Sequence, residues 1–184
     1  MQFIHLPNWL TIAVDIFAWY SIHLSVSWLA RRVPERFLAE KAYWFRTRDW
    51  EKEGEIWQEV FRVRSWKPYL PDGTKITKEG FDKTHLKGFD MASLEKFALE
   101  TRRAELAHWA MIPPAGLFFF WNPAWAGWIM IGYAVLFNLP LIFVQRYNRP
   151  RLERMVRRKA ERSEVNQRMP HKLSRKTQMD ERVT

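Results

Sequence analysis

Glu105 and His108 lie one helical turn apart in Glu100–Trp109, where a charged stretch runs directly into an apolar one. An α-helix advances by about 100° per residue, so both side chains fall on one face. The apolar members of that face make it the inward one. The whole face comprises Leu94, Ala98, Thr101, Glu105, His108 and Ile112. An acid and a base turned inward at the edge of an apolar segment predict proton-transfer chemistry at a lipid boundary.

His108 is the strongest candidate for a catalytic residue. We expect its imidazole to act as general base on a hydroxyl group, with Glu105, and less directly Glu100, orienting it and balancing its charge. The alternative is an interfacial histidine that only hydrogen-bonds a backbone carbonyl. Glu-x-x-His is also half of a di-metal carboxylate site, but the chain lacks the second half, so no metal is expected. His23 is the second candidate for the base.

Basic residues follow the apolar runs and have two interpretations. Arg102 and Arg103 either anchor a membrane segment at its charged end or bind the phosphates of a nucleotide-bearing donor, because guanidinium groups match phosphate oxygens. Arg146 and Arg149 lie in a similar run, in which Asn148 is not needed for anchoring. We count these residues among the donor- or substrate-binding candidates.

Three apolar runs predict an all-α integral membrane protein. They are Leu10–Ala30, Trp109–Trp121 and Trp125–Val144, and many of the eleven Trp lie at their ends, as is typical of the membrane interface. We therefore expect about three transmembrane helices, over residues 9–30, 105–121 and 124–145. Pro113-Pro114 breaks the second run, which leaves a kinked or re-entrant path open.

The distribution of Lys and Arg predicts a multi-pass protein of the cell membrane with its N-terminus outside. Residues 1–8 and the hairpin tip carry none, whereas basic residues follow the first and third runs. Residues 1–152 then form one membrane domain with a cytosolic cap at 31–104 and amphipathic helices from Pro34 towards Arg46, from Asp49 and from about Asp90. The chain has no cysteine, which excludes disulfide and thiolate chemistry.

Residues 153–184 form a basic cytosolic tail that we expect to be partly disordered. Residues 146–184 hold thirteen Lys/Arg against five Asp/Glu and carry much of the net charge of +10. The charge favours contact with anionic membrane lipid. No nucleic-acid partner is expected, because no recognition motif accompanies the charge.

Polar residues also occur inside the first apolar run. Thr11, Asp15 and Trp19 form a stripe at helical spacing. An acidic residue in a membrane segment is a functional candidate. The slightly favoured interpretation of Asp15 is a hydrogen bond across a helix contact.

Several short motifs occur together in one order and carry a family resemblance over roughly residues 44–152. They are Arg48-Asp49-Trp50-Glu51, Trp66-Lys67, Leu70-Pro71-Asp72-Gly73, Glu100–Glu105 with His108-Trp109, Trp121-Asn122-Pro123, Asn138-Leu139-Pro140 and Gln145–Arg149. In these motifs the chain resembles the glycosyl-4,4′-diaponeurosporenoate acyltransferase family. Those membrane enzymes add a fatty acyl chain to the sugar of a glycosylated carotenoid.

The resemblance implies acyl transfer from a thioester, acyl-CoA or acyl carrier protein, to a sugar hydroxyl of a membrane glycolipid, with no other cofactor. The cytosolic mouth of the site is expected to be lined by Trp66, Lys67 and Asp72. Asp72 or Asn148 would hydrogen-bond the sugar hydroxyls. Asn122 is a further binding candidate. Two alternatives stay open. One is another lipid-modifying membrane enzyme, and the other is a non-enzymatic membrane adaptor with a lipid-binding tail.

Overall fold

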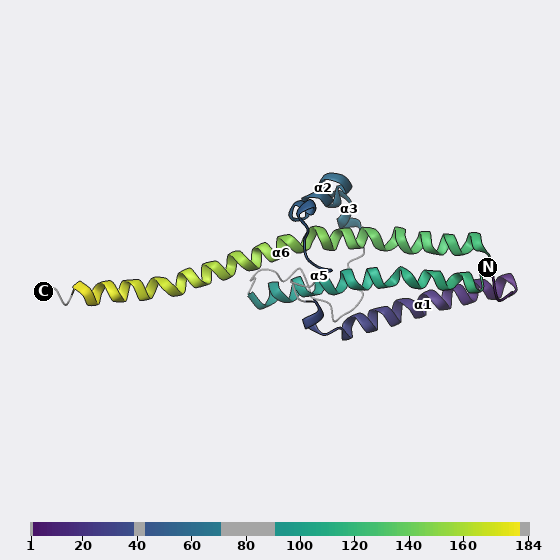
Figure 1. Ribbon diagram of the computed structural model, residues 1–184, viewed down its shortest axis with the longest axis horizontal. Coiled ribbons are helices and arrows are strands. Elements are labelled where there is room, and N and C mark those ends of the chain that lie inside the picture. Colours follow the sequence, from purple (N-terminus) through teal and green to yellow (C-terminus); the bar gives the residue numbers. More distant parts are fainter. Residues whose placement is uncertain (1, 39–42, 71–90, 181–184) are drawn as a thin grey trace.

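Three long helical segments lie side by side, and a group of short helices packs against the outer side of the longest one (Figure 1). The structure, a computed structural model, describes residues 2–38, 43–70 and 91–180, with side chains as far as residue 165. The long elements are α1 (Asn8–Arg32), α5 (Met91–Met111) and α6 (Ala124–Asp180). Over these described ranges every regular element is helical, as predicted.

Two helices in the described part of the chain are long and apolar enough to cross a membrane, namely α1 and the first part of α6. The most apolar stretch of α1 has no buried residue, and Ile16 and Phe17 are each about two-thirds or more exposed, at 67% and 71%. Trp128 and Leu136 of α6 also point outward. Apolar side chains left uncovered on this scale indicate a lipid environment, so the protein is membrane-associated.

The segment predicted as a span over residues 105–121 is divided into two pieces, so the three-span expectation is not confirmed. The helix α5 ends at Met111, and Pro113 and Pro114 open a three-ten helix, η5 (Pro113–Phe120). Proline has no N–H group, so two prolines in succession remove two of the backbone hydrogen bonds that would continue the α-helix. The first half of α5 is charged and η5 has only eight residues, so neither piece alone is both long and apolar enough to cross a membrane.

Four of the six residues predicted for the inward face of α5 are buried, and the other two, His108 and Ile112, are half-buried. The buried residues of α5 are Leu94, Ala98, Thr101, Arg102 and Glu105, and the helix packs against both α6 and α1. A helical period of 3.6 accounts for the spacing of this face, which extends from an apolar start into charged side chains.

At the turn between η5 and α6, Asp15 of α1 accepts hydrogen bonds from Trp121 Nε1 and Asn122 Nδ2, both at 2.7 Å. Trp19, one turn further along α1, stacks on Phe118 of η5 with ring centroids 4.8 Å apart. The favoured interpretation of Asp15, a hydrogen bond across a helix contact, is confirmed.

The short helices of the cap are mostly of the three-ten type where amphipathic α-helices were expected. Of the predicted helix from Pro34 towards Arg46, the described residues form η1 (Glu35–Leu38) and a turn at 43–45, and residues 39–42 lie outside them. From Asp49 the chain forms η2 (Asp49–Gly54), α2 (Glu55–Phe61), α3 (Val63–Trp66) and η3 (Lys67–Tyr69). The expected helix start at Asp90 lies outside the described residues, and so does Asp72.

Gly54 is the point at which the cap meets α6 most closely. Its φ is +89°, and a Cβ there would lie 3.1 Å from the Arg146 carbonyl oxygen and 3.2 Å from that of Tyr147. Pro150 has no N–H to donate, so the Arg146 carbonyl lacks the helical hydrogen bond that it would otherwise accept. Trp57 and Val63 then pack on Tyr147 in a small apolar core. Only glycine satisfies both the conformation and the close approach.

The helix α6 continues past the apolar segment to Asp180 and extends away from the other helices (Figure 1). The basic tail is therefore the second half of the same helix. The partial disorder expected for residues 153–184 stays a prediction.

Candidate active site

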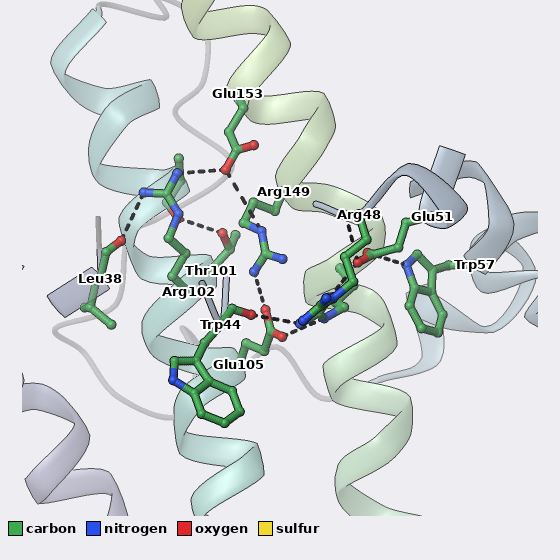
Figure 2. A network of polar contacts seen from close by, with 12 residues as sticks. Leu38, Trp44, Arg48, Glu51, Trp57, Thr101, Arg102, Glu105, Arg149 and Glu153 are labelled. Carbon is green, nitrogen blue, oxygen red and sulfur yellow. Dashed lines mark hydrogen bonds and ion pairs between the residues drawn. The ribbon is translucent and has the colours of Figure 1, made fainter. Parts of the chain in front are cut away.

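A buried network of ion pairs joins the cap, α5 and α6 at the charged end of the bundle (Figure 2). Glu105 of α5 is its centre, with 1% of its side chain exposed. One carboxylate oxygen accepts from Arg146 Nε at 2.7 Å, and the other accepts from Arg149, which is fully buried. Arg146 also donates to Glu51 at 2.6 Å, and Glu51 accepts from Trp57 Nε1 at 3.3 Å.

A second branch of the network lies on the other side of Arg149. Figure 2 shows Arg149 between Glu105 and Glu153. Arg102 donates to Glu153 at 2.7 Å and to the Leu38 carbonyl at 3.2 Å, while Arg149 Nε is 4.0 Å from Glu153. The six ionic groups are three glutamates and three arginines, so their formal charges cancel. Buried charges are tolerated only when paired in this way, because each loses its hydration on burial.

His108 lies three residues beyond Glu105 on α5, about 4.5 Å further along the helix at 1.5 Å per residue. Its Nδ1 is 3.0 Å from Oδ1 of Asn138 on α6, and Asn138 Nδ2 donates to the Ala134 carbonyl at 2.8 Å. The amide nitrogen of Asn138 is thus occupied and its oxygen, which can only accept, faces the imidazole. In the neutral imidazole this bond places the proton on Nδ1, and Nε2 keeps its lone pair. A base needs that tautomer.

The structure gives His108 a different orienting partner from the one expected. Glu105 was expected to hold the imidazole, but both of its oxygens are bound to Arg146 and Arg149. Glu100 pairs with Arg103 at 3.2 Å. Asn138 was missed because a shared helix face identifies inward residues without identifying what lies opposite. The available signal was an amide within an apolar run.

His23 of α1 faces the same region. Its ring packs beside that of Trp19 with centroids 5.7 Å apart, and Trp19 packs in turn on Tyr133 of α6 at 5.2 Å. Its Nδ1 is buried and has no hydrogen-bond partner among the described residues. Buried ring nitrogens without partners are uncommon, so this atom is a candidate contact for a bound group.

The arginines expected at a donor site are engaged within the chain. Arg103 donates to the carbonyls of Ala30 at 2.8 Å, Arg31 at 3.0 Å and Val33 at 3.1 Å, and so caps the end of α1. Arg102 belongs to the buried network. Direct contact of Arg102 or Arg103 with a donor stays a prediction.

The remaining candidates lie in two places. Lys67 donates to Asn148 at 2.8 Å, and Trp66 donates to the Phe61 carbonyl at 2.7 Å, so these three lie together where the cap meets α6. Asn122 lies apart from them, buried against Asp15 at the turn between η5 and α6. About 21 Å of α6 separates Asn138 from the start of the helix at Ala124.

The geometry defines a class of protein: a membrane-associated helical protein that holds an oriented histidine beside a buried charge network. Comparison with known proteins specifies the class further. The family model for glycosyl-4,4′-diaponeurosporenoate acyltransferase matches residues 41–158. The acyltransferase of that name from Staphylococcus aureus (strain MRSA252) is 38% identical over 139 residues, which cover 76% of this chain and 84% of the relative.

The corresponding protein of S. aureus strain Newman is 38% identical over 147 residues, covering 78% of this chain and 88% of the relative. That of strain bovine RF122 / ET3-1 is 37% identical over 139 residues, covering 76% and 84%. No solved structure gives a significant match. The chain belongs to the glycosyl-4,4′-diaponeurosporenoate acyltransferase family, and the resemblance seen in its motifs is confirmed.

Proposed function

We propose that this protein transfers a fatty acyl group from a thioester donor to a sugar hydroxyl of a membrane glycolipid. The glycosyl-diaponeurosporenoate in the names of its relatives is the model for the acceptor. The observation that carries the mechanism is the His108–Asn138 hydrogen bond, because it selects the tautomer of the neutral imidazole in which Nε2 can accept a proton. Acyl transfer to an alcohol requires a base of this kind.

The proposed reaction uses His108 twice. Nε2 removes the proton from the sugar hydroxyl while its oxygen attacks the thioester carbonyl and forms the new C–O bond. The C–S bond then breaks, and the imidazolium returns the proton to the departing thiolate. Asn138 holds the ring through Nδ1 in both stages. The products are the acylated sugar and a free thiol, so atoms and charges balance.

The other candidates have supporting roles in this proposal. Glu105, held by Arg146 and Arg149, fixes the position of α5 against α6 and so places His108 relative to Asn138. Lys67, Trp66 and Asn148 form part of the cytosolic mouth, and the acceptor's lipid body lies between the helices. Asp72 stays a predicted member of the mouth.

We further propose that the protein is a multi-pass protein of the cell membrane with three crossings, an external N-terminus and a cytosolic tail. From Glu105 to Met111 and along η5, rises of about 1.5 and 2.0 Å per residue give roughly 25 Å. That length is close to the ~30 Å of a hydrocarbon core. Arg31, Arg103 and Arg146 mark one end of the bundle, and the Asp15–Trp121 contact marks the other.

Lipid mass spectrometry tests the proposed function. A host that makes a glycosylated carotenoid should form its acyl ester when this chain is expressed and not when His108→Ala is expressed at the same level. An unchanged lipid profile with the wild-type chain would contradict acyl transfer to this acceptor. A non-enzymatic adaptor predicts that no ester forms with either chain.

A further inference from the structure

A cavity of about 430 Å³ opens at the charged end of the bundle, between the cap and α6. The cap side contributes Phe45, Arg46, Thr47 and Arg48, and α6 contributes Pro150 and Arg157 among others. It begins beyond Arg146 on α6, outside the apolar part of the helix. Its volume is in the range of small-molecule sites in proteins.

The cavity favours an anion. Its lining holds four cationic side chains and three carboxylates, and two of those carboxylates are paired with arginines from outside the lining. Glu153 binds Arg102, and Glu53 binds Arg154. Among the cations Lys52 is paired in the same way, with Glu59 at 3.1 Å. Arg46 forms no ion pair with any residue of the described ranges. Guanidinium groups such as Arg46 match phosphate oxygens in geometry and charge.

Two side chains of this region have buried polar atoms without hydrogen-bond partners among the described residues. Thr47 Oγ1, in the lining, is buried with no partner within the described part of the chain, and so are Nε and Nη2 of Arg149. Arg149 contacts the lining through Glu153 and through the Phe45 ring, whose centroid is 5.9 Å from its guanidinium carbon. Buried polar atoms are nearly always bonded, so the pattern is that of a site that receives polar groups from outside.

The charge at the rim is persistent. The guanidinium carbon of Arg48 lies 4.8 Å from the centroid of the Tyr43 ring. Hydrogen bonding and charge attraction from this guanidinium hold the pKa of the Tyr43 hydroxyl below its usual value. The arginine side chain itself stays protonated at any physiological pH. A phosphate at this rim therefore meets positive charge throughout the range in which the enzyme works.

The position of the cavity relative to His108 restricts the ligand. Asn138, which orients His108, and Pro150, in the lining, are twelve residues apart on α6, or about 18 Å. The two donors considered for the reaction share a phosphopantetheine arm, an extended chain with a phosphate at one end and the thioester sulfur at the other. A phosphate in the cavity would let such an arm bring the thioester to the level of the imidazole.

We infer that this cavity binds the phosphate end of the donor's phosphopantetheine arm, whether the arm belongs to coenzyme A or to acyl carrier protein. This inference rests on the proposed acyl transfer and assigns its donor site. Arg46 and Thr47 are the residues that contact the phosphate end. The acyl chain then extends from the sulfur towards the apolar part of the bundle.

Binding measurements on the purified full-length protein in lipid nanodiscs test the inference. Arg46→Gln should weaken coenzyme A binding about tenfold, because a charge-assisted hydrogen bond is lost. Thr47→Val should weaken it about threefold without lowering thermal stability, since its hydroxyl has no partner in the unliganded protein. Arg36→Gln, an exposed arginine of η1 outside the cavity, is the matched control and should bind as the wild type does.

Two further arms separate the possible outcomes. If coenzyme A does not bind, holo acyl carrier protein should bind more tightly than its apo form, which lacks the arm, and Arg46→Gln should remove that difference. Equal binding by Arg46→Gln, Thr47→Val and wild type for both ligands would overturn the inference. If His108→Ala binds normally and no protein transfers an acyl group, the donor site stands and the proposed reaction fails.

Discussion

Replacing Glu105 by Gln tests whether the charge network is a buried unit. The change keeps the shape of the side chain and removes the charge that Arg146 and Arg149 share. Arg146 retains Glu51 at 2.6 Å, so it stays paired. Arg149, which is fully buried, retains only Glu153 at 4.0 Å, and Glu153 is already bound to Arg102.

The expected cost is therefore that of one uncompensated buried charge, about 3–5 kcal/mol, and not that of two broken ion pairs. No discount for solvent applies, because the two side chains are 1% and 0% exposed. Glu100→Gln is the matched control. Its pair with Arg103 is partly exposed, with 41% of Glu100 accessible to solvent, so losing it should cost less than about 1 kcal/mol.

Adding Arg149→Met to Glu105→Gln should recover most of the loss, since the Glu51–Arg146 and Glu153–Arg102 pairs then remain balanced. The measurement is equilibrium unfolding in mixed micelles, followed by circular dichroism. It is made on Glu105→Gln, on Arg149→Met, on the variant that combines them and on the control Glu100→Gln. Two results would refute the reasoning: a Glu105→Gln cost no larger than that of Glu100→Gln, or a double variant as unstable as the sum of the singles.

Three further predictions concern the mechanism, the topology and an arginine. His108→Ala should fold normally and lose about 10²–10⁴-fold in activity, and the rise of kcat/KM with pH that accompanies imidazole deprotonation should vanish. Asn138→Leu should lower activity about tenfold or more, because the tautomer of His108 is no longer fixed. Near-normal turnover of purified His108→Ala would exclude His108 as the base. Cysteines placed at Gln2 and Ser174 should react with an impermeant thiol reagent from opposite sides of the membrane, whereas labelling from one side contradicts three crossings. Arg103→Gln should reduce stability by about 1–2 kcal/mol through loss of the α1 cap, with the KM for the donor unchanged; a raised KM would instead support direct contact with donor phosphate.

Helical periodicity was sufficient to predict the inward face of α5. Spacings of three and four residues identify Leu94, Ala98, Thr101 and Glu105 as neighbours, and the structure buries all four. Apolar runs likewise located α1 and the first part of α6. These features depend on local geometry and on residue type, which a single sequence contains.

The partners of the buried charges could not be predicted in the same way. Glu105 is separated by 41 and 44 residues from the two arginines that bind it, and nothing local distinguishes Arg146 and Arg149 from membrane anchors. The position of Asn138 opposite His108 depends on the register of α6 against α5. The three-ten geometry of the cap also depends on tertiary contact, since the Gly54 turn is shaped by the backbone of α6.

The closure of the network by α6 imposes an order on biosynthesis. Glu51 and Glu105 leave the ribosome well before the arginines that neutralise them, and a nascent chain that ends before Arg146 contains neither ionic partner of Glu105. Both carboxylates must therefore remain hydrated until the last long helix arrives. Docking of the cap is in consequence a late event, because it needs the arginines of α6.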